Sequence, residues 1–169
     1  SANLLFDGST LTAKAGSASV PAVVGQYGHS SPSSAPFQIL TSAGAVESEW
    51  KSKGDTNQFI GKTVGNLSLS GTQNSGFGFS VLNSLTSGAS NAGMGGYALS
   101  SLTTGSDNLA LGYLASYLLT TGSNNVSIGS NAGRLNQTAN GNLAIGTAAL
   151  YNATAGGNVG IGTQAAYNN

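Results

Sequence analysis

The last two thirds of the chain repeat one arrangement of polar and apolar residues at a nearly constant spacing. Each unit opens with an asparagine, has a large apolar residue three positions later and a glycine directly after it, as in NVSIG at the start of residues 125–141. The interval between successive units is constant except for the last, which is one residue shorter. The opening asparagines are Asn57, Asn74, Asn91, Asn108, Asn125, Asn142 and Asn158, and the glycines are Gly61, Gly78, Gly95, Gly112, Gly129, Gly146 and Gly162. A fixed period of this length predicts a solenoid, because one unit buries its apolar residues only by stacking on its neighbours.

Within a unit, the residues after the asparagine alternate in size as they do in a β-strand. In the last three units, with the asparagine counted as position zero, positions one and three are large and position two is small, as in Leu143, Ala144 and Ile145. This period of two predicts a strand with one face directed inward. The glycine at position four is expected to form a corner, and the stacked asparagines are expected to form a ladder of side-chain hydrogen bonds. Gly, Asn, Ser and Thr interrupt every unit, so no stretch is long enough for the helices of a helical solenoid.

The predicted fold is therefore all-β, a parallel β-roll (β-solenoid) of about seven coils of 16 or 17 residues. We expect the repeat array to span residues 57–169 and to end part of the way through a coil. Residues 1–56 are expected to form a small, irregular β region that connects to the first coil and caps it, with Trp50 at the open end. Apolar runs at residues 3–6, 20–24 and 37–40 predict short strands in this region. It holds seven of the ten charged residues of the chain: Asp7, Lys14, Glu47, Glu49, Lys51, Lys53 and Asp55.

Composition restricts the partners and the chemistry. The chain has 169 residues with zero formal net charge, 6% charged residues and no cysteine. Nucleic acid and anionic membranes ask for a basic surface, so neither is an expected partner. No apolar run approaches the ~20 residues of a membrane-spanning helix, so membrane insertion is not expected either. Without cysteine, thiol catalysis and thiolate metal sites are excluded.

No residue pattern predicts an enzyme. His29, the only histidine, stands in a serine-rich segment, and nothing places an acidic partner beside it. Residues 160–165 match a dinucleotide-binding pattern, but no helix is expected after them, which that site requires. We therefore expect no catalytic residues, no metal site and no cofactor.

One column of the array is a candidate for recognition. Position nine holds Tyr117, Arg134, Tyr151 and Tyr167 in successive units. Stacking would place these residues in one line and allow cation–π contacts. Aromatic faces bind sugar rings, so the column is a candidate site for a glycan or another receptor. The alternative is that these large side chains are buried, either against the roll or at an interface between chains.

The repeat also resembles a known type of sequence. The units NLAIGTAALYNATAGG and NVGIGTQAAYNN, at residues 142–169, resemble the Asn-x-Ala-Ile-Gly-x-x-Ala-Leu repeats of bacteriophage tail fibres, and Asn57–Gly61 resembles a variant of the same unit. The repeats are more loosely similar to the head repeats of trimeric autotransporter adhesins. The resemblance implies a left-handed parallel β-roll that assembles as a homotrimer, in a virion fibre that contacts a host surface.

A trimer also has a physical argument. A coil as short as this repeat is narrow, so one roll has a thin core, and rolls packed side by side would bury one another's faces. We expect columns of small residues to allow this close approach, namely Ala110, Ser127, Ala144 and Gly160, or Ala98, Ala115, Ala132 and Ala149. The pattern leaves open whether three separate rolls or one intertwined triple β-helix forms.

Three functions are compatible with the pattern. The first is a structural, host-contacting segment of a phage tail fibre, located in the virion, without catalysis. The second is the head of a trimeric adhesin on a bacterial surface. The third is a solenoid that binds ice or another surface through a threonine ladder, for which the candidate residues are Thr86, Thr103, Thr120 and Thr154.

Overall fold

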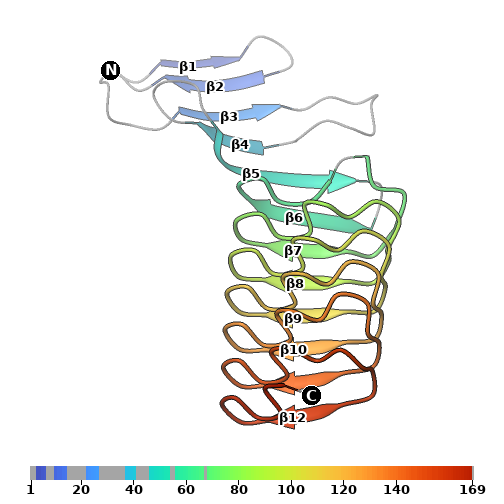
Figure 1. Ribbon diagram of the computed structural model, residues 1–169. Coiled ribbons are helices and arrows are strands. Elements are labelled where there is room, and N and C mark those ends of the chain that lie inside the picture. Colours follow the sequence, from blue (N-terminus) through green and yellow to red (C-terminus); the bar gives the residue numbers. More distant parts are fainter. Residues whose placement is uncertain are drawn as a thin grey trace.

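The structure is a computed structural model. It describes residues 56–66 and 68–168 in full, and the backbone of five strands between residues 3 and 53. None of these residues is helical. Twelve strands form one sheet in the order in which they follow along the chain (Figure 1). The chain therefore advances along one axis, and each strand pairs with the strand before it and the strand after it.

The first five strands form an antiparallel meander. They are β1 (Asn3–Phe6), β2 (Thr10–Lys14), β3 (Ala22–Gln26), β4 (Phe37–Leu40) and β5 (Val46–Lys53). The strands predicted at residues 3–6 and 37–40 are confirmed, while β3 begins two residues later than residue 20. The segment expected as a connector is itself a strand, since β5 pairs antiparallel with the first strand of the array, with the backbone of Trp50 opposite Ile60. The side chain of Trp50, and His29 as a whole, lie outside the described residues.

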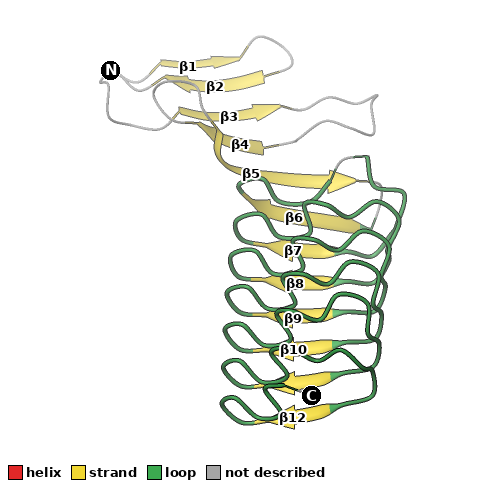
Figure 2. Ribbon diagram, in the orientation of Figure 1, coloured by secondary structure: helices red, strands yellow, loops and turns green. Residues whose placement is uncertain are grey.

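From Asn57 onward the pairing is parallel and in register. The strands are β6 (Asn57–Gly61), β7 (Ser75–Phe77), β8 (Ala92–Met94), β9 (Leu109–Leu111), β10 (Val126–Ile128), β11 (Leu143–Ile145) and β12 (Val159–Ile161). Ser127, for example, lies beside Ala110 on one side and Ala144 on the other, so equal positions of the repeat stack. Seven parallel strands connected by turns make a β-solenoid, as predicted (Figure 2). Each coil stacks on the next coil of the same chain.

The small residues line the inside of the coil, contrary to our expectation that they face neighbouring rolls. Ala110 and Ala144 at position two are at most 1% exposed, and position seven is fully buried in six coils. The interior has no room for more: a Cβ added at Gly76 would lie 2.9 Å from the ring of Phe59 and 3.2 Å from Val64. The large residues at positions one and three therefore point outward. The rest of the core consists mainly of leucines from positions eight, eleven and twelve: Leu69, Leu82, Leu85, Leu99, Leu102, Leu119 and Leu150.

Each coil has a return segment, which connects one strand to the next. In this segment the sign of the backbone angle φ alternates from residue to residue, and the sequence does not predict this alternation. Residues at positions six and eight have positive φ in every coil, although most are not glycine; Leu82 has φ 53° and Tyr97 has φ 61°. This conformation costs roughly 1–2 kcal/mol for an ordinary L-residue. Its effect is to aim peptide N–H groups at both neighbouring coils: Ser80 donates to Lys62 O of the preceding coil, and Leu82 donates to Ala98 O of the following coil. These inter-coil hydrogen bonds offset the strain.

Candidate functional site

The asparagine ladder is formed as predicted, and it lies inside the coil. The side chains of Asn74, Asn91, Asn108 and Asn125 are at most 2% exposed. In each of them Nδ2 donates to Oδ1 of the preceding asparagine at 3.0–3.1 Å, and to the position-fourteen carbonyl of its own coil at 2.9 Å. Oδ1 in turn accepts from the next backbone N–H, as in Asn125 N to Asn108 Oδ1 at 3.0 Å. The ladder is thus a structural element that leaves no face of these amides for a ligand.

The ladder is interrupted where the repeat becomes one residue shorter. Asn142 opens the shortened coil, and its Nδ2 is buried without a hydrogen-bond partner. Its Oδ1 still accepts from Asn158 N at 2.9 Å. Nδ2 of Asn158 donates to Ala155 O at 2.8 Å. The asparagine of the shortened coil therefore lacks both hydrogen bonds that Nδ2 makes in the four preceding coils.

Except for the exposed polar residues Gln58 and Ser75 on the first two strands, the outward side chains of the parallel strands form an apolar surface, which we call the outer sheet face. Its most exposed members are Phe77 (52%), Met94 (53%), Val159 (65%) and Ile161 (65%). The others are Ile60, Ala92, Leu109, Leu111, Val126, Ile128, Leu143 and Ile145, all half-buried. None of these residues is charged. The face extends over all seven strands of the array.

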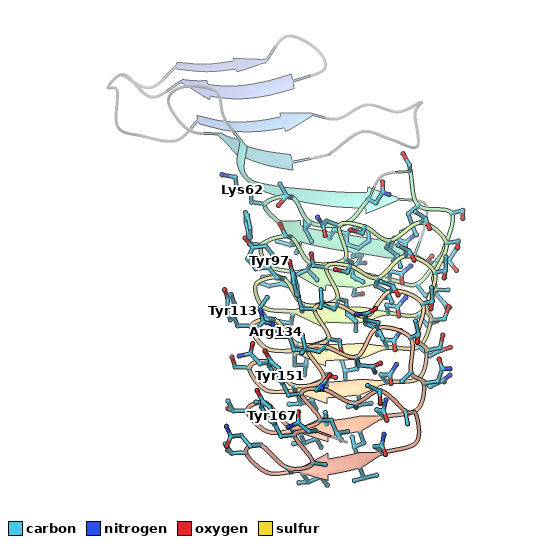
Figure 3. The ribbon with its side chains drawn as sticks, viewed as in Figure 1. Lys62, Tyr97, Tyr113, Arg134, Tyr151 and Tyr167 are labelled. Atoms are coloured by element: carbon cyan, nitrogen blue, oxygen red, sulfur yellow. The ribbon has the colours of Figure 1, made fainter. Side chains whose placement is uncertain are left out.

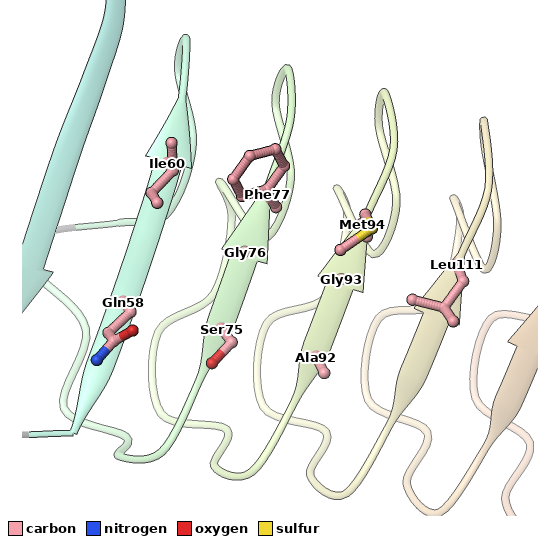
Figure 4. A pocket seen from close by; sticks show the side chains of 9 residues that line it. All are labelled: Gln58, Ile60, Ser75, Gly76, Phe77, Ala92, Gly93, Met94 and Leu111. Atoms are coloured by element: carbon pink, nitrogen blue, oxygen red, sulfur yellow. The ribbon is translucent and has the colours of Figure 1, made fainter.

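Near the first coils, the outer sheet face is hollowed. The hollow has a volume of about 230 Å³ and lies where position one is small, at Ser75 and Ala92, and position two is glycine (Figure 4). Phe77 and Met94 stand along its edge in the position-three column. In later coils the larger residues at position one, such as Leu109, replace this notch with a ridge.

The four residues predicted to stack at position nine do come together. The guanidinium carbon of Arg134 lies 6.0 Å from the ring centre of Tyr117 and 5.8 Å from that of Tyr151. Nη1 of Arg134 donates to the hydroxyl of Tyr151 at 2.9 Å. Tyr151 and Tyr167 are stacked with ring centres 4.7 Å apart and planes 3° apart. The prediction of a cation–π column is therefore confirmed as geometry.

Three further aromatic residues extend this column, and sequence reasoning missed them. Tyr97 is the centre of the extension, with ring centres 5.1 Å from Phe79, 6.3 Å from Tyr113 and 6.1 Å from Tyr117, all edge to face. Phe79 and Tyr113 occupy position five, and Tyr97 occupies position six, so column alignment alone does not join them to position nine. The set now runs along the solenoid axis over six coils (Figure 3). We call it the aromatic stripe: Phe79, Tyr97, Tyr113, Tyr117, Arg134, Tyr151 and Tyr167.

The threonine ladder proposed for surface binding forms only in part. Thr86, Thr103 and Thr120 stack, and each hydroxyl donates to a backbone carbonyl of the following coil at 2.9–3.0 Å. Gln137 takes the same position in the next coil and separates Thr154 from the other three. Since the hydroxyl protons are used between coils, the ladder serves the cohesion of the solenoid.

The described part of the chain contains no group of three or more His, Cys, Asp or Glu side chains that could hold a metal ion. Within the same residues, no helix is long and apolar enough to cross a membrane. Comparisons of the chain with protein families, with curated proteins and with solved structures find no match.

Proposed function

We propose that this chain is a structural segment of a homotrimeric bacteriophage tail fibre, which acts at the host surface without catalysis. The observation that carries the proposal is the outer sheet face. An apolar outward face is expected of a solenoid that packs against copies of itself. The resemblance of the repeats to tail-fibre sequences names the kind of fibre. The fibre would be located in the virion.

The outer sheet face has the character of a surface that is covered in use. Phe77 and Met94 on it are more than half exposed, and every outward side chain of the later strands, from Leu109 to Ile161, is apolar. A contiguous apolar patch of this kind marks an interaction site, because isolated soluble proteins keep such patches small. No charged side chain on the face would have to be desolvated. A partner with an equally apolar surface therefore fits it.

A second and a third copy of the chain supply such a surface. In a closed ring whose symmetry axis is parallel to the solenoid axis, each coil of one copy meets the equivalent coil of the next copy. Phe77 and Met94 of one copy would then lie at the level of the hollow at Ser75 and Ala92 in its neighbour. The outer sheet face supports association with copies of itself, and the number three follows from the resemblance.

The function that this assembly performs is mechanical. Most described backbone hydrogen bonds between coils run along the solenoid axis, so a pull along the fibre loads many of them together. Few long loops leave the described array, and exposed loops are the usual sites of proteolytic cleavage. These two properties suit the chain to serve as a stiff, protease-resistant spacer or tip of the fibre.

The oligomeric state tests the proposal directly. We expect light scattering to give a mass of about three times the 16.6 kDa of the chain before boiling in detergent, and the mass of one chain afterwards. A protein that is monomeric at micromolar concentration before boiling would remove the tail-fibre proposal.

A charge on the outer sheet face is expected to dissociate the trimer. Ile145→Asp would place three carboxylates close to the symmetry axis, where burial and mutual repulsion both oppose ionisation. The matched control is Thr147→Asp, two residues later in the same coil, because Thr147 is exposed on the return segment. We expect the first variant to sediment as a folded monomer and the second to remain trimeric. A trimeric Ile145→Asp protein would show that another face is buried.

A further inference from the structure

The aromatic stripe has the geometry of a repeating platform. Successive rings and the guanidinium of Arg134 contact one another without a break, at 4.7–6.3 Å, from Phe79 to Tyr167. Coils in a parallel sheet advance by about 4.8 Å, which is close to the length of one sugar unit in an extended polysaccharide. The spacing of the stripe thus matches a linear polymer that lies along the solenoid axis.

The stripe lies on the return segments of the coils, and not on the strands that carry the outer sheet face (Figure 3). Position seven packs against the inner side of the strands, since a Cβ at Gly93 would meet Val81 and Ala98. The segment around position seven therefore covers the inside of the sheet. Figure 3 shows Tyr113, at position five, at the edge where the strands end, and Arg134 and Tyr151, at position nine, on the return segment. A trimer that buries the outer sheet face leaves the aromatic stripe in contact with solvent.

The chemistry of the stripe suits a neutral ligand. Tyr113 is 55% exposed, Phe79 41% and Tyr167 36%, so ring surface is available along its length. The stripe contains no carboxylate, and its one cation, Arg134, already lies between two rings and donates to Tyr151. Polar side chains flank the rings, among them Asn83, which is exposed and accepts a hydrogen bond from Ser100 at 3.0 Å. Ring faces for C–H contacts, with hydroxyl and amide groups beside them, are the groups that recognise sugars.

We propose that the aromatic stripe binds an extended, uncharged polysaccharide whose sugar units contact the exposed rings of Phe79, Tyr113 and Tyr167 along the solenoid axis. The inference deepens the proposed function, because it names the class of host-surface molecule that the fibre contacts. The site is complete within one chain, so its occupancy does not require the trimer.

The test is isothermal titration of the intact protein with linear neutral oligosaccharides of about six units, long enough to span the stripe at about 4.8 Å per coil. The probes are maltohexaose, laminarihexaose, cellohexaose, xylohexaose and mannohexaose, with an oligomer of alginate as the anionic comparison. Tyr113→Ala removes an exposed ring from the stripe. Thr104→Ala is its control, because Thr104 is exposed and belongs neither to the aromatic stripe nor to the outer sheet face.

We expect at least one neutral probe to bind with one site per chain, and the alginate oligomer not to bind. Tyr113→Ala should weaken the affinity roughly threefold to tenfold, the usual value of one aromatic contact, and Thr104→Ala should leave it unchanged. Absence of binding by all neutral probes, or equal affinity in the Tyr113→Ala protein, would overturn the inference.

Light scattering on the same samples separates this inference from the proposed function. Binding to a protein that is monomeric would support the glycan site and reject the trimeric fibre. A trimer without binding would give the opposite result. Dissociation of the trimer by Tyr113→Ala would identify the stripe as an interface between chains and would also overturn the inference.

Discussion

Replacement of Gly112 by alanine is expected to destabilise the solenoid by more than about 4 kcal/mol, at the upper end of what one substitution does. Gly112 has φ 141°, a conformation that side-chain-bearing residues rarely adopt. A Cβ at this position would lie 2.5 Å from the carbonyl oxygen of Gly129 in the next coil and 2.6 Å from its carbonyl carbon. Both are backbone atoms of a neighbouring corner, so the two coils would have to separate.

Gly157→Ala is the control that isolates the contribution of stacking. Gly157 also has a positive φ, 77°, but a Cβ there would meet no atom within 4 Å. Its substitution carries only the backbone strain, about 1–2 kcal/mol. Urea unfolding followed by far-UV circular dichroism, at one fixed protein concentration, measures both variants. Equal losses of stability would mean that the corner glycines are required for their φ alone, and not for the close approach of the coils.

The repeat predicted the fold because stacking converts a sequence period into columns. Equal spacing of Asn108 and Asn125 requires their strands to pair in register, and the backbone of β9 and β10 does so. The glycine at position four and the asparagine at position zero each have one chemical role that other residues perform poorly. These two positions were therefore correctly assigned from the sequence.

The inside and the outside of the strand could not be assigned from the alternation of size alone. A period of two shows that one face is buried, and the larger residues are the usual choice for the core. Here the short coil brings Val64 and Val81 so close to the strands that only Gly, Ala or Ser fits at position two in most coils. Coil width, which is a tertiary property, decides that Ile145 and Ile161 point outward.

The aromatic stripe was found only in part for a related reason. Alignment by repeat position joined Tyr117 to Tyr151 but could not join Tyr97 or Tyr113, which belong to other columns. Contact between columns depends on the path of the return segment, and that path depends on residues with positive φ such as Leu99 and Leu114. Leucine has no propensity for this conformation, so the sequence contains no local signal for it.

Substitution of Asn108 by alanine should cost about 3–5 kcal/mol, although the same change at Asn142 should cost about 1 kcal/mol. Asn108 Nδ2 donates to Asn91 Oδ1 at 3.0 Å and to Gly122 O at 2.9 Å, and its Oδ1 accepts from Asn125 N at 3.0 Å. Removal of this amide leaves the Asn125 N–H and the Gly122 carbonyl without these partners inside a dry core.

Asn142→Ala is the matched control, because the Nδ2 group that it removes is already unpaired. It loses one hydrogen bond, the one from Asn158 N to Oδ1. The free energies of unfolding of the two variants, obtained in urea at the same protein concentration, measure the difference. If both substitutions cost the same, the asparagines would contribute through their shape and backbone preference, and the amide ladder would not be the interaction that holds successive coils in register.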